Sequence, residues 1–421
     1  MIYILIFFLL ELLLLEYFTS RADILHISFS MLLVFIFACL VVIINTSWDY
    51  KMSFEMLMLV FSSFIVIFAG EHITRLFYHK PQMTYEIKKY AEISVNPTTF
   101  LMSIIYMTLV AIIYSYSVIR LGRTAMLQGM SSSLFGAYRH SAIQTGSSVG
   151  LLPSLLLQIS ECIAYTYLLL FISSRKRKYL IPILLYIFPT ILSTARSEIV
   201  KIIISGIVFY YFVCTRPSGN SNKFVNEFLK VVVLGAAAFV ALGLLTGKAN
   251  YYHSFFENVS MYIGSSIPAF DEYLSNFHYD INDFGAETLW GINNFFRKFG
   301  IRMFNSDKNY LPYTYFLYMN HSTNIYTFLR RPLNDFGVVG TYLIMFILSV
   351  IYTRFYLKLV NNQYVHATFA LFAFATLYYP VFWIFADFRF FDVISITGIF
   401  ELIVYYLIAQ RIDKKLEQIQ E

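Results

Sequence analysis

Charged residues are scarce in this sequence. Asp, Glu, Lys and Arg make up only 13% of its 421 residues, whereas 58% of the residues are hydrophobic and the mean hydropathy is +0.63. A soluble globular domain carries roughly a quarter charged residues, and a soluble protein of this composition would aggregate. The few charges also fall in short clusters between long apolar runs. We therefore predict an integral membrane protein.

Several signatures of enzymes are missing as well. The sequence has no Walker loop, no Gly-x-Gly-x-x-Gly motif, no His-Glu-x-x-His helix and no Asp-x-Asp pair. The three cysteines, Cys39, Cys162 and Cys214, lie within or at the end of apolar runs and are too scattered for a disulfide framework or a zinc site. The net charge of +6 needs no nucleic-acid partner to explain it.

Long apolar runs are the dominant feature that is present. Since about 20 apolar residues cross a hydrocarbon core of roughly 30 Å, we predict about eleven transmembrane helices, within a range of ten to twelve. In lipid every backbone amide must bond within its own segment, so the predicted fold is all-α and polytopic. The predicted spans cover residues 2–18, 24–44, 52–69, 98–119, 151–172, 179–192, 198–214, 228–247, 335–357, 365–386 and 390–410.

Basic residues predict the orientation of these spans, because they stay on the cytoplasmic side of short loops. With eleven spans, five Lys/Arg-rich connections fall on one side, which places the C-terminus in the cytoplasm. The predicted organisation is spans one to eight in 1–247, a long extracytoplasmic loop in 248–334, spans nine to eleven in 335–410 and a cytoplasmic tail in 411–421. The five connections are 75–89, 175–178, the segment with Arg216, Lys223 and Lys230, the pair Arg354 and Lys358, and the tail with Arg411, Lys414 and Lys415.

The predicted external loop, 248–334, is too aromatic to be a linker. Its 87 residues include 22 Phe, Tyr or Trp residues together with several carboxylates, whereas linkers are rich in Gly, Ser and Pro. The stretch 293–304, NNFFRKFGIRMF, mixes apolar and basic residues as interfacial helices do. Aromatic rings flanked by carboxylates also suit sugars, although an aromatic belt that anchors a cap to the membrane explains part of the composition.

A polar corner, STARSE at 193–198, joins two short apolar pieces. Ser193 or Thr194 can cap the following helix, and the free amides at such a helix start lie beside Arg196, which makes an anion site. A salt bridge from Arg196 to Glu198 is the structural alternative. A sunken corner of this kind is costly in lipid unless something polar is bound, so we predict a phosphate site there.

The second motif, TNIYTFLRRPLNDFGVVG at 323–340, places Arg330 and Arg331 on the predicted outer face, where the positive-inside rule disfavours them. Guanidinium groups match phosphate oxygens bidentately. We expect Asn334 or Asp335 to cap the following helix, and Gly337 and Gly340 to give it a small-residue packing face. His321, just upstream, is a candidate general base, with a surface role as its alternative.

The chain resembles the Wzy-type O-antigen or oligosaccharide repeat-unit polymerases in two motifs, STARSEIVKIIISGIVFYY at 193–211 and the motif at 323–340, and in its layout of ten to twelve spans with one large late loop. The resemblance implies a C-type membrane glycosyltransferase in the bacterial inner membrane, which transfers the growing chain from undecaprenyl pyrophosphate to a new lipid-linked repeat unit. It assigns Arg196 with Arg330 or Arg331 to the pyrophosphate, and His321 to the acceptor hydroxyl. Residues expected to bind substrate are Ser193, Thr194, Glu198, Asn324, Tyr326 and Asp335.

The expected partners are the undecaprenyl-pyrophosphate-linked oligosaccharide and membrane lipids, with a chain-length regulator and a flippase implied by the family alone. We predict no cofactor and no metal requirement, since arginines can stabilise the leaving group. An O-antigen ligase would share the layout and differ in its acceptor. A flippase or other transporter is the alternative of another class, kept open by Glu55, Glu161 and Glu401 within predicted spans.

Overall fold

The chain folds into two compact units, each built from three separate stretches of sequence. The first unit comprises Met1–Thr84, Phe256–Gln363 and Pro380–Gly398, and the second comprises Tyr85–Phe255, Tyr364–Tyr379 and Ile399–Glu421. This computed structural model describes every residue except 21–22, 46–47, 79–89, 132, 145–148, 194–195, 216–254, 282–283, 298, 305–310, 317–320, 362 and 421.

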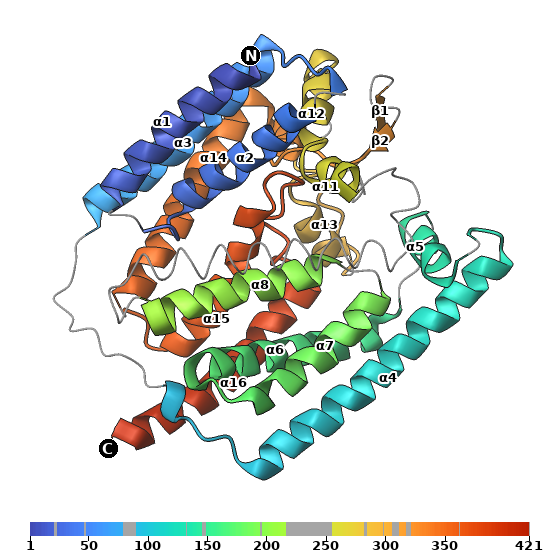
Figure 1. Cartoon of the computed structure of the whole chain (residues 1–421), viewed down its shortest axis with the longest axis vertical. Helices are drawn as coiled ribbons and strands as arrows, with labels where there is room; N and C mark the ends of the chain where they lie inside the picture. Colours follow the sequence, from blue (N-terminus) through green and yellow to red (C-terminus); the bar gives the residue numbers. More distant parts are fainter. Residues whose placement is uncertain are drawn as a thin grey trace. The chain divides into compact units, whose positions relative to one another are not determined.

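Helices make up most of the first unit (Figure 1). Short helices and a two-stranded antiparallel hairpin, with Phe316 opposite His321, come from the predicted external loop. The elements are α1 (Ile2–Thr19), α2 (Ile27–Ile44), α3 (Phe54–Phe77), α11 (Phe255–Ile263), α12 (Ser266–Ser275), α13 (Trp290–Arg297), β1 (Thr314–Phe316), β2 (His321–Thr323) and α14 (Arg330–Val360).

All the regular secondary structure described in the second unit is helical. Its longest helix, α4, is tied to α6 by the Tyr106 hydroxyl, which donates to the Leu156 carbonyl at 3.0 Å. The elements are η2 (Tyr90–Glu92), α4 (Pro97–Leu127), α5 (Leu134–Gln144), α6 (Leu151–Ser174), η3 (Arg177–Tyr179), α7 (Leu180–Leu192), α8 (Arg196–Tyr210), the π-helical turn η4 (Tyr211–Thr215), α15 (Ala367–Phe382) and α16 (Ile396–Gln420). The last residues of α15 and the first residues of α16 belong to the first unit.

The prediction of an all-α membrane protein is confirmed, but the prediction of eleven spans is wrong. Within the described part of the chain, seven helices are long and apolar enough to cross a membrane: α1, α2, α3, α4, α6, the run Ser197–Thr215 and α14. The predicted spans at 179–192 and 365–386 form helices of only 13 and 16 residues. At 1.5 Å per residue these reach about 20–24 Å, less than the roughly 30 Å of hydrocarbon.

Two other predicted spans differ in other ways. The apolar run at 390–410 forms α16, which begins only at Ile396 and carries charged residues such as Arg411, Asp413 and Lys414 along its second half. The run at 228–247 lies outside the described residues. Because the predicted sidedness of the loops depended on the count of spans, the cytoplasmic C-terminus stays a prediction.

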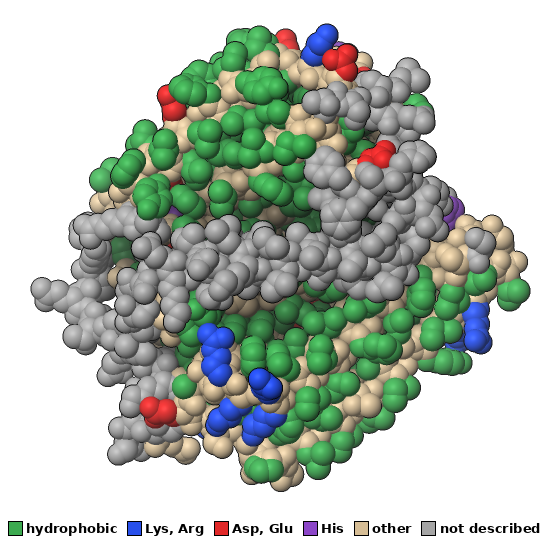
Figure 2. Space-filling model, viewed as in Figure 1, with side chains coloured by type: hydrophobic (Ala, Val, Ile, Leu, Met, Phe, Trp, Pro, Cys, Tyr) green, Lys and Arg blue, Asp and Glu red, His purple; other side chains and the backbone are tan. Residues whose placement is uncertain are grey.

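Apolar side chains project outward from the spanning helices, as expected for surfaces in contact with lipid. Figure 2 shows hydrophobic side chains over the visible faces of α1 and α4. Phe7 and Phe18 on α1 are 57% and 75% exposed, and Met102 and Ile112 on α4 are 62% and 61% exposed. Isolated exposed apolar residues are ordinary in soluble proteins, whereas whole helix faces of them require an apolar solvent.

Helices α3 and α14 pack side by side and run in the same direction within the first unit. The Ser62 and Tyr342 hydroxyls lie 2.6 Å apart, and the Tyr78 hydroxyl donates to the Gln363 side-chain oxygen at 2.6 Å, where both helices have ended. The basic residues near the two C-terminal ends therefore share one end of this unit. The start of α14, with its two arginines, lies at the other end.

Candidate functional site

The segment that leads into α14 is not helical, although it lies deep in the first unit. Phe328 packs against Phe35 and Phe64, with ring centroids 6.3 and 5.9 Å away, and these two rings lie near the middles of α2 and α3. The backbone amides of Tyr326 and Phe328 donate to the carbonyls of Ala386 and Ile384 at 3.2 and 2.8 Å. Non-helical backbone at membrane depth is tolerated only where protein or water satisfies it, and here the segment after α15 does so.

Arg330 follows directly and is only 4% exposed. Its guanidinium forms an ion pair with the Glu287 carboxylate, which comes from the turn before α13. The guanidinium carbon also lies 4.0 Å from the centre of the Tyr273 ring and 5.5 Å from that of Tyr326. A desolvated cation over an aromatic face is stabilised by the ring's quadrupole, so three side chains hold one arginine, two of them from distant parts of the sequence.

Arg331 is paired as closely, with a different partner. Its Nε and one terminal nitrogen donate to the two oxygens of Asp387 at 2.6 and 3.0 Å, which is the bidentate geometry that guanidinium favours. Arg389 lies 3.4 Å from Asp387 and donates to Asp392 at 3.1 Å. Burial alone would raise the pKa of Asp387, but Arg331 and Arg389 outweigh it and lower that pKa below its ordinary value.

Asp335 fastens the external loop to α14 instead of capping the helix. Its carboxylate accepts the backbone N–H groups of Glu287 and Thr288 at 3.0 and 2.5 Å. The helix begins at Arg330, with Leu329 as an N-cap residue that makes no side-chain bond. The predicted cap at Asn334 or Asp335 is therefore wrong, because the loop amides are the donors that the carboxylate meets.

Gly337 does not contribute to a small-residue packing face either. Its backbone has φ 64° and ψ −170°, which interrupts the helix between Arg330 and Val360. A positive φ favours glycine, which lacks a Cβ. The first turns of α14, with both arginines, are thus set apart from the long straight part that follows.

Together these groups form what we call the arginine cluster, and it is electrically nearly balanced. Its three cations face three paired carboxylates, with Asp335 as a fourth acid held by backbone amides. The Nε of Arg330 is buried and has no hydrogen-bond partner among the described residues. Burial raises the pKa of Glu287 despite Arg330 and Arg331, so that carboxylate releases its partner more readily than an ordinary glutamate. The members are Arg330, Arg331, Arg389, Glu287, Asp387, Asp392, Asp335 and the ring of Tyr273.

The other predicted residues of this region lie on the hairpin and just after it. His321 begins β2 opposite Phe316, and its side chain is outside the described part of the chain. Asn324 is half-buried. The Tyr326 hydroxyl donates to the Pro312 carbonyl at 2.9 Å and lies 2.6 Å from the Thr314 hydroxyl, which anchors β1. The predicted substrate role of Tyr326 stays a prediction.

The predicted corner at 193–198 belongs to the second unit. Ser193 ends α7, and its hydroxyl donates to the Thr190 carbonyl at 2.9 Å, so it does not cap α8. Thr194 and the side chain of Arg196 are outside the described residues. Glu198 accepts from the Tyr186 hydroxyl and the Lys201 ammonium, both at 3.1 Å. The convergence of Arg196 with Arg330 and Arg331 stays a prediction, since the two sites lie in different units.

Sequence reasoning missed Glu287, Asp387, Arg389 and Tyr273. One signal was present in DFRFFD at 387–392, where Arg389 stands in a predicted outer connection and breaks the positive-inside pattern as the doublet does. No comparable signal marks Glu287 or Tyr273. Their pairing with Arg330 depends on loop geometry that no local periodicity encodes.

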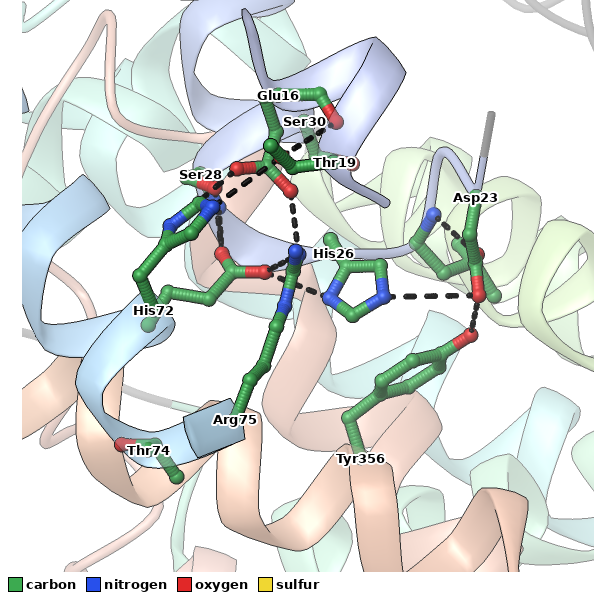
Figure 3. A network of polar contacts seen from close by, with 12 residues as sticks. Glu16, Thr19, Asp23, His26, Ser28, Ser30, His72, Thr74, Arg75 and Tyr356 are labelled. Carbon is green, nitrogen blue, oxygen red and sulfur yellow. Dashed lines mark hydrogen bonds and ion pairs between the residues drawn. The ribbon is translucent and has the colours of Figure 1, made fainter. Parts of the chain in front are cut away.

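Two further buried ionic groups lie elsewhere. Glu161 and Glu401 are 4% and 5% exposed in the second unit, where Gln158 donates to Glu401 at 3.1 Å. Glu55, in contrast, is exposed in the first turn of α3. At the far end of α3 lies a second cluster of the first unit, which surrounds Arg75 (Figure 3).

Comparisons with known proteins add no assignment to this geometry. No family model matches the chain, and neither a characterised protein nor a solved structure has significant similarity to it.

Proposed function

We propose that this protein is a membrane glycosyltransferase that polymerises undecaprenyl-pyrophosphate-linked oligosaccharides into a surface polysaccharide. The observation that carries the proposal is the placement of Arg330 and Arg331. Both arginines are buried in the first turn of α14, directly after a non-helical segment whose Phe328 ring packs near the middles of two spanning helices. Burying paired charges brings little net stability, so apolar residues at the start of the helix would stabilise the fold at least as well. A role in binding an anionic, lipid-linked substrate would explain why buried arginines occur there.

The proposed reaction breaks the bond between the anomeric carbon and the pyrophosphate oxygen of the donor. A hydroxyl oxygen of the acceptor sugar forms the new bond to that carbon, and its proton passes to a base, for which His321 is the candidate. The electron pair of the broken bond leaves with undecaprenyl pyrophosphate. The charge that develops on that leaving group is what fixed cations stabilise.

Within the arginine cluster, the groups differ in how they can serve this step. Arg331 is held bidentately by Asp387 and is best suited to position its neighbours. Arg330 offers a buried Nε–H, and it offers a terminal N–H as well when Glu287 takes up a proton. The Arg389 side chain is 40% exposed, which makes it the cation of the cluster that a bound headgroup meets first. Arg196 is the proposed contribution from the second unit.

The experiment is complementation of a strain that lacks the native gene, with surface glycan length read on a gel. We expect Arg330→Ala combined with Arg331→Ala to abolish the long chains, because removing one preorganised donor already costs about 100-fold or more in rate. The matched control is Arg354→Ala, which removes an exposed arginine from the same helix. Full-length ladders from a well-expressed double variant would contradict the proposal. A ligase would instead leave lipid-linked polymer intact in the double variant.

A transporter is the second candidate, and the buried pair Glu161 and Glu401 favours it. Carboxylates within membrane helices often mark a transport path, and this pair lies in the second unit with Lys201 nearby. The discriminating assay is movement of a lipid-linked repeat unit across vesicles that contain the purified protein. Transport that Glu161→Gln abolishes, without glycan polymerisation, would favour this candidate.

A further inference from the structure

The second buried cluster of the first unit lies where four helices end or begin. Its side chains come from the end of α1, the start of α2 and the last turns of α3 and α14 (Figure 3). This is the end of α14 opposite the arginine cluster, so the two clusters do not share a site. We call it the carboxylate cluster. Its members are Glu16, Asp23, His26, Ser28, Glu71, Arg75 and Tyr356.

Three of its side chains present ligand atoms to one another. One oxygen or nitrogen each from Glu16, His26 and Glu71 lies within 4.8 Å of the other two. The three residues are 0%, 7% and 0% exposed. A carboxylate oxygen of Glu71 lies 2.6 Å from Nδ1 of His26. Mixed carboxylate and imidazole donors at this spacing suit a divalent transition metal, above all Zn²⁺.

The surroundings orient these three groups as the outer groups of a metal site do. Ser28 donates its backbone N–H and its hydroxyl to one oxygen of Glu71, at 2.9 and 2.5 Å, which leaves the other oxygen for the centre. On the far side of the imidazole, Nε2 of His26 lies 3.7 Å from a carboxylate oxygen of Asp23. Tyr356 donates to that oxygen. A carboxylate behind the histidine fixes its ring and raises its basicity as a ligand.

A buried carboxylate oxygen in the centre has unmet bonding capacity. Among the described residues, Oε2 of Glu16 has no hydrogen-bond partner. Nδ1 of His72 lies 3.8 Å from it, which is beyond hydrogen-bond distance. Burying such an atom without a partner costs free energy, and a metal ion bound between Glu16, His26 and Glu71 would satisfy it.

Arg75 now supplies positive charge to the centre. It donates to both Glu16 and Glu71. A divalent ion in place of the guanidinium, bound to a neutral imidazole and two carboxylates, leaves the centre with no net charge. The Arg75 side chain is 17% exposed near the end of α3, so it can swing outward along the helix to the polar surface.

We propose that Glu16, His26 and Glu71 form a binding site for a divalent metal, with Zn²⁺ as the preferred ion, which is occupied in exchange for the Arg75 guanidinium. The site is separate from the proposed reaction, and the prediction that the reaction needs no metal is unchanged. Zinc there would tie the ends of three helices together.

The test is equilibrium binding of Zn²⁺ to purified full-length protein, with bound metal measured by elemental mass spectrometry and Mg²⁺ as the comparison ion. We expect about one zinc per chain, with affinity at least about tenfold higher in Arg75→Gln, where the competing cation is gone. His26→Gln and Glu71→Gln should lose the site. Asp23→Asn should weaken it by roughly 10- to 100-fold, as loss of an outer carboxylate does. Glu55→Gln, which changes an exposed carboxylate at the other end of α3, should bind as the wild type does.

Variants are compared only where they elute as a single species in detergent, so that misfolding is not mistaken for loss of a ligand. Zinc-free wild type and zinc-free Arg75→Gln, both well folded, would overturn the proposal. Equal zinc content in wild type and His26→Gln would overturn it as well.

Discussion

The two ionic clusters of the first unit occupy opposite ends of α14 and are built in opposite ways. In the arginine cluster, Arg330 and Arg331 each have a carboxylate of their own, Glu287 and Asp387. Its two arginines begin α14 directly after a non-helical segment, and their partners come from the predicted external loop and from the segment after α15. In the carboxylate cluster, a single guanidinium, that of Arg75, bridges two carboxylates on regular helices.

This difference indicates which kind of ligand each cluster can bind. The arginine cluster holds its cations in fixed positions, and one buried N–H of Arg330 has no hydrogen-bond partner among the described residues, which suits an anionic ligand. The carboxylate cluster gathers the carboxylates of Glu16 and Glu71 around one guanidinium, and among the described residues it leaves an oxygen of Glu16 without a hydrogen-bond partner, which suits a cation. On the two proposals made above, one helix connects a phosphate-binding site at its start to a metal-binding site near its end.

The largest expected effect on stability is the loss of a carboxylate from the arginine cluster. Asp387→Ala leaves Arg331 as a buried charge without its bidentate partner, and we expect a destabilisation of about 3–5 kcal/mol. Thermal unfolding in detergent measures it. The matched control is Asp392→Ala, which removes a carboxylate that is 32% exposed and should cost less than about 1 kcal/mol. Equal losses of stability from the two substitutions would show that the buried partner of Arg331 matters no more to folding than the partly exposed partner of Arg389.

The next largest effect distinguishes the carboxylate cluster from the arginine cluster by the response of each to zinc. We expect Zn²⁺ to raise the unfolding temperature of Arg75→Gln, since a ligand at 100 times its dissociation constant stabilises by about 2.7 kcal/mol. The same zinc should stabilise Asp387→Ala less, and by no more than it stabilises the wild type, because this variant keeps Arg75 as the competing cation of the carboxylate cluster. Stabilisation of both variants by the same amount would mean that zinc acts elsewhere.

The all-α membrane class could be predicted from hydropathy alone, because only helices satisfy their backbone in lipid when no barrel pattern exists. The number of spans could not be predicted from hydropathy. Apolar runs such as 179–192 and 365–386 have the composition of a span, but composition does not distinguish a spanning helix from a shorter one. Their observed lengths, 13 and 16 residues, fall below the hydrocarbon thickness.

The candidate site was predictable in part. The positive-inside rule singled out Arg330 and Arg331, and the structure places both in an unusual buried segment. The start of α14 was misplaced because backbone bonds from Ile384 and Ala386, over 50 residues away, determine where the segment becomes helical. Asp335 looked like a cap by its position, yet its acceptors are taken by loop amides that only tertiary structure brings near.

A smaller effect should come from Tyr273, whose ring covers Arg330 and whose hydroxyl donates to the Asn334 side chain at 3.0 Å. Tyr273→Leu removes both contacts and should cost about 2 kcal/mol or more. Tyr273→Phe keeps the ring and should cost only about 1 kcal/mol, the value of the hydrogen bond. The free energies of unfolding of the two variants in denaturant measure the difference. Equal losses would show that the ring contributes nothing to holding the cation.

The smallest expected effect is a dependence on pH. The pKa of Asp387 is lowered in the folded protein because Arg331 and Arg389 outweigh its burial. Its ion pair therefore contributes fully above the ordinary aspartate pKa of about 3.9 and is lost as the pH falls through the lower folded value. The gap in unfolding temperature between wild type and Asp387→Asn should be constant from pH 5 to 7 and narrow below about pH 4. A gap that narrows already near neutral pH would contradict the assigned ion pair.

The central claim is that the arginine cluster binds the pyrophosphate of a lipid-linked donor, and binding of undecaprenyl pyrophosphate to the purified protein tests it most directly. The account predicts that Arg330→Ala weakens this binding by at least about tenfold, or ~1.4 kcal/mol. Arg354→Ala, exposed on the same helix, should bind as the wild type does. Equal affinity in the wild type and a well-folded Arg330→Ala variant would contradict the claim.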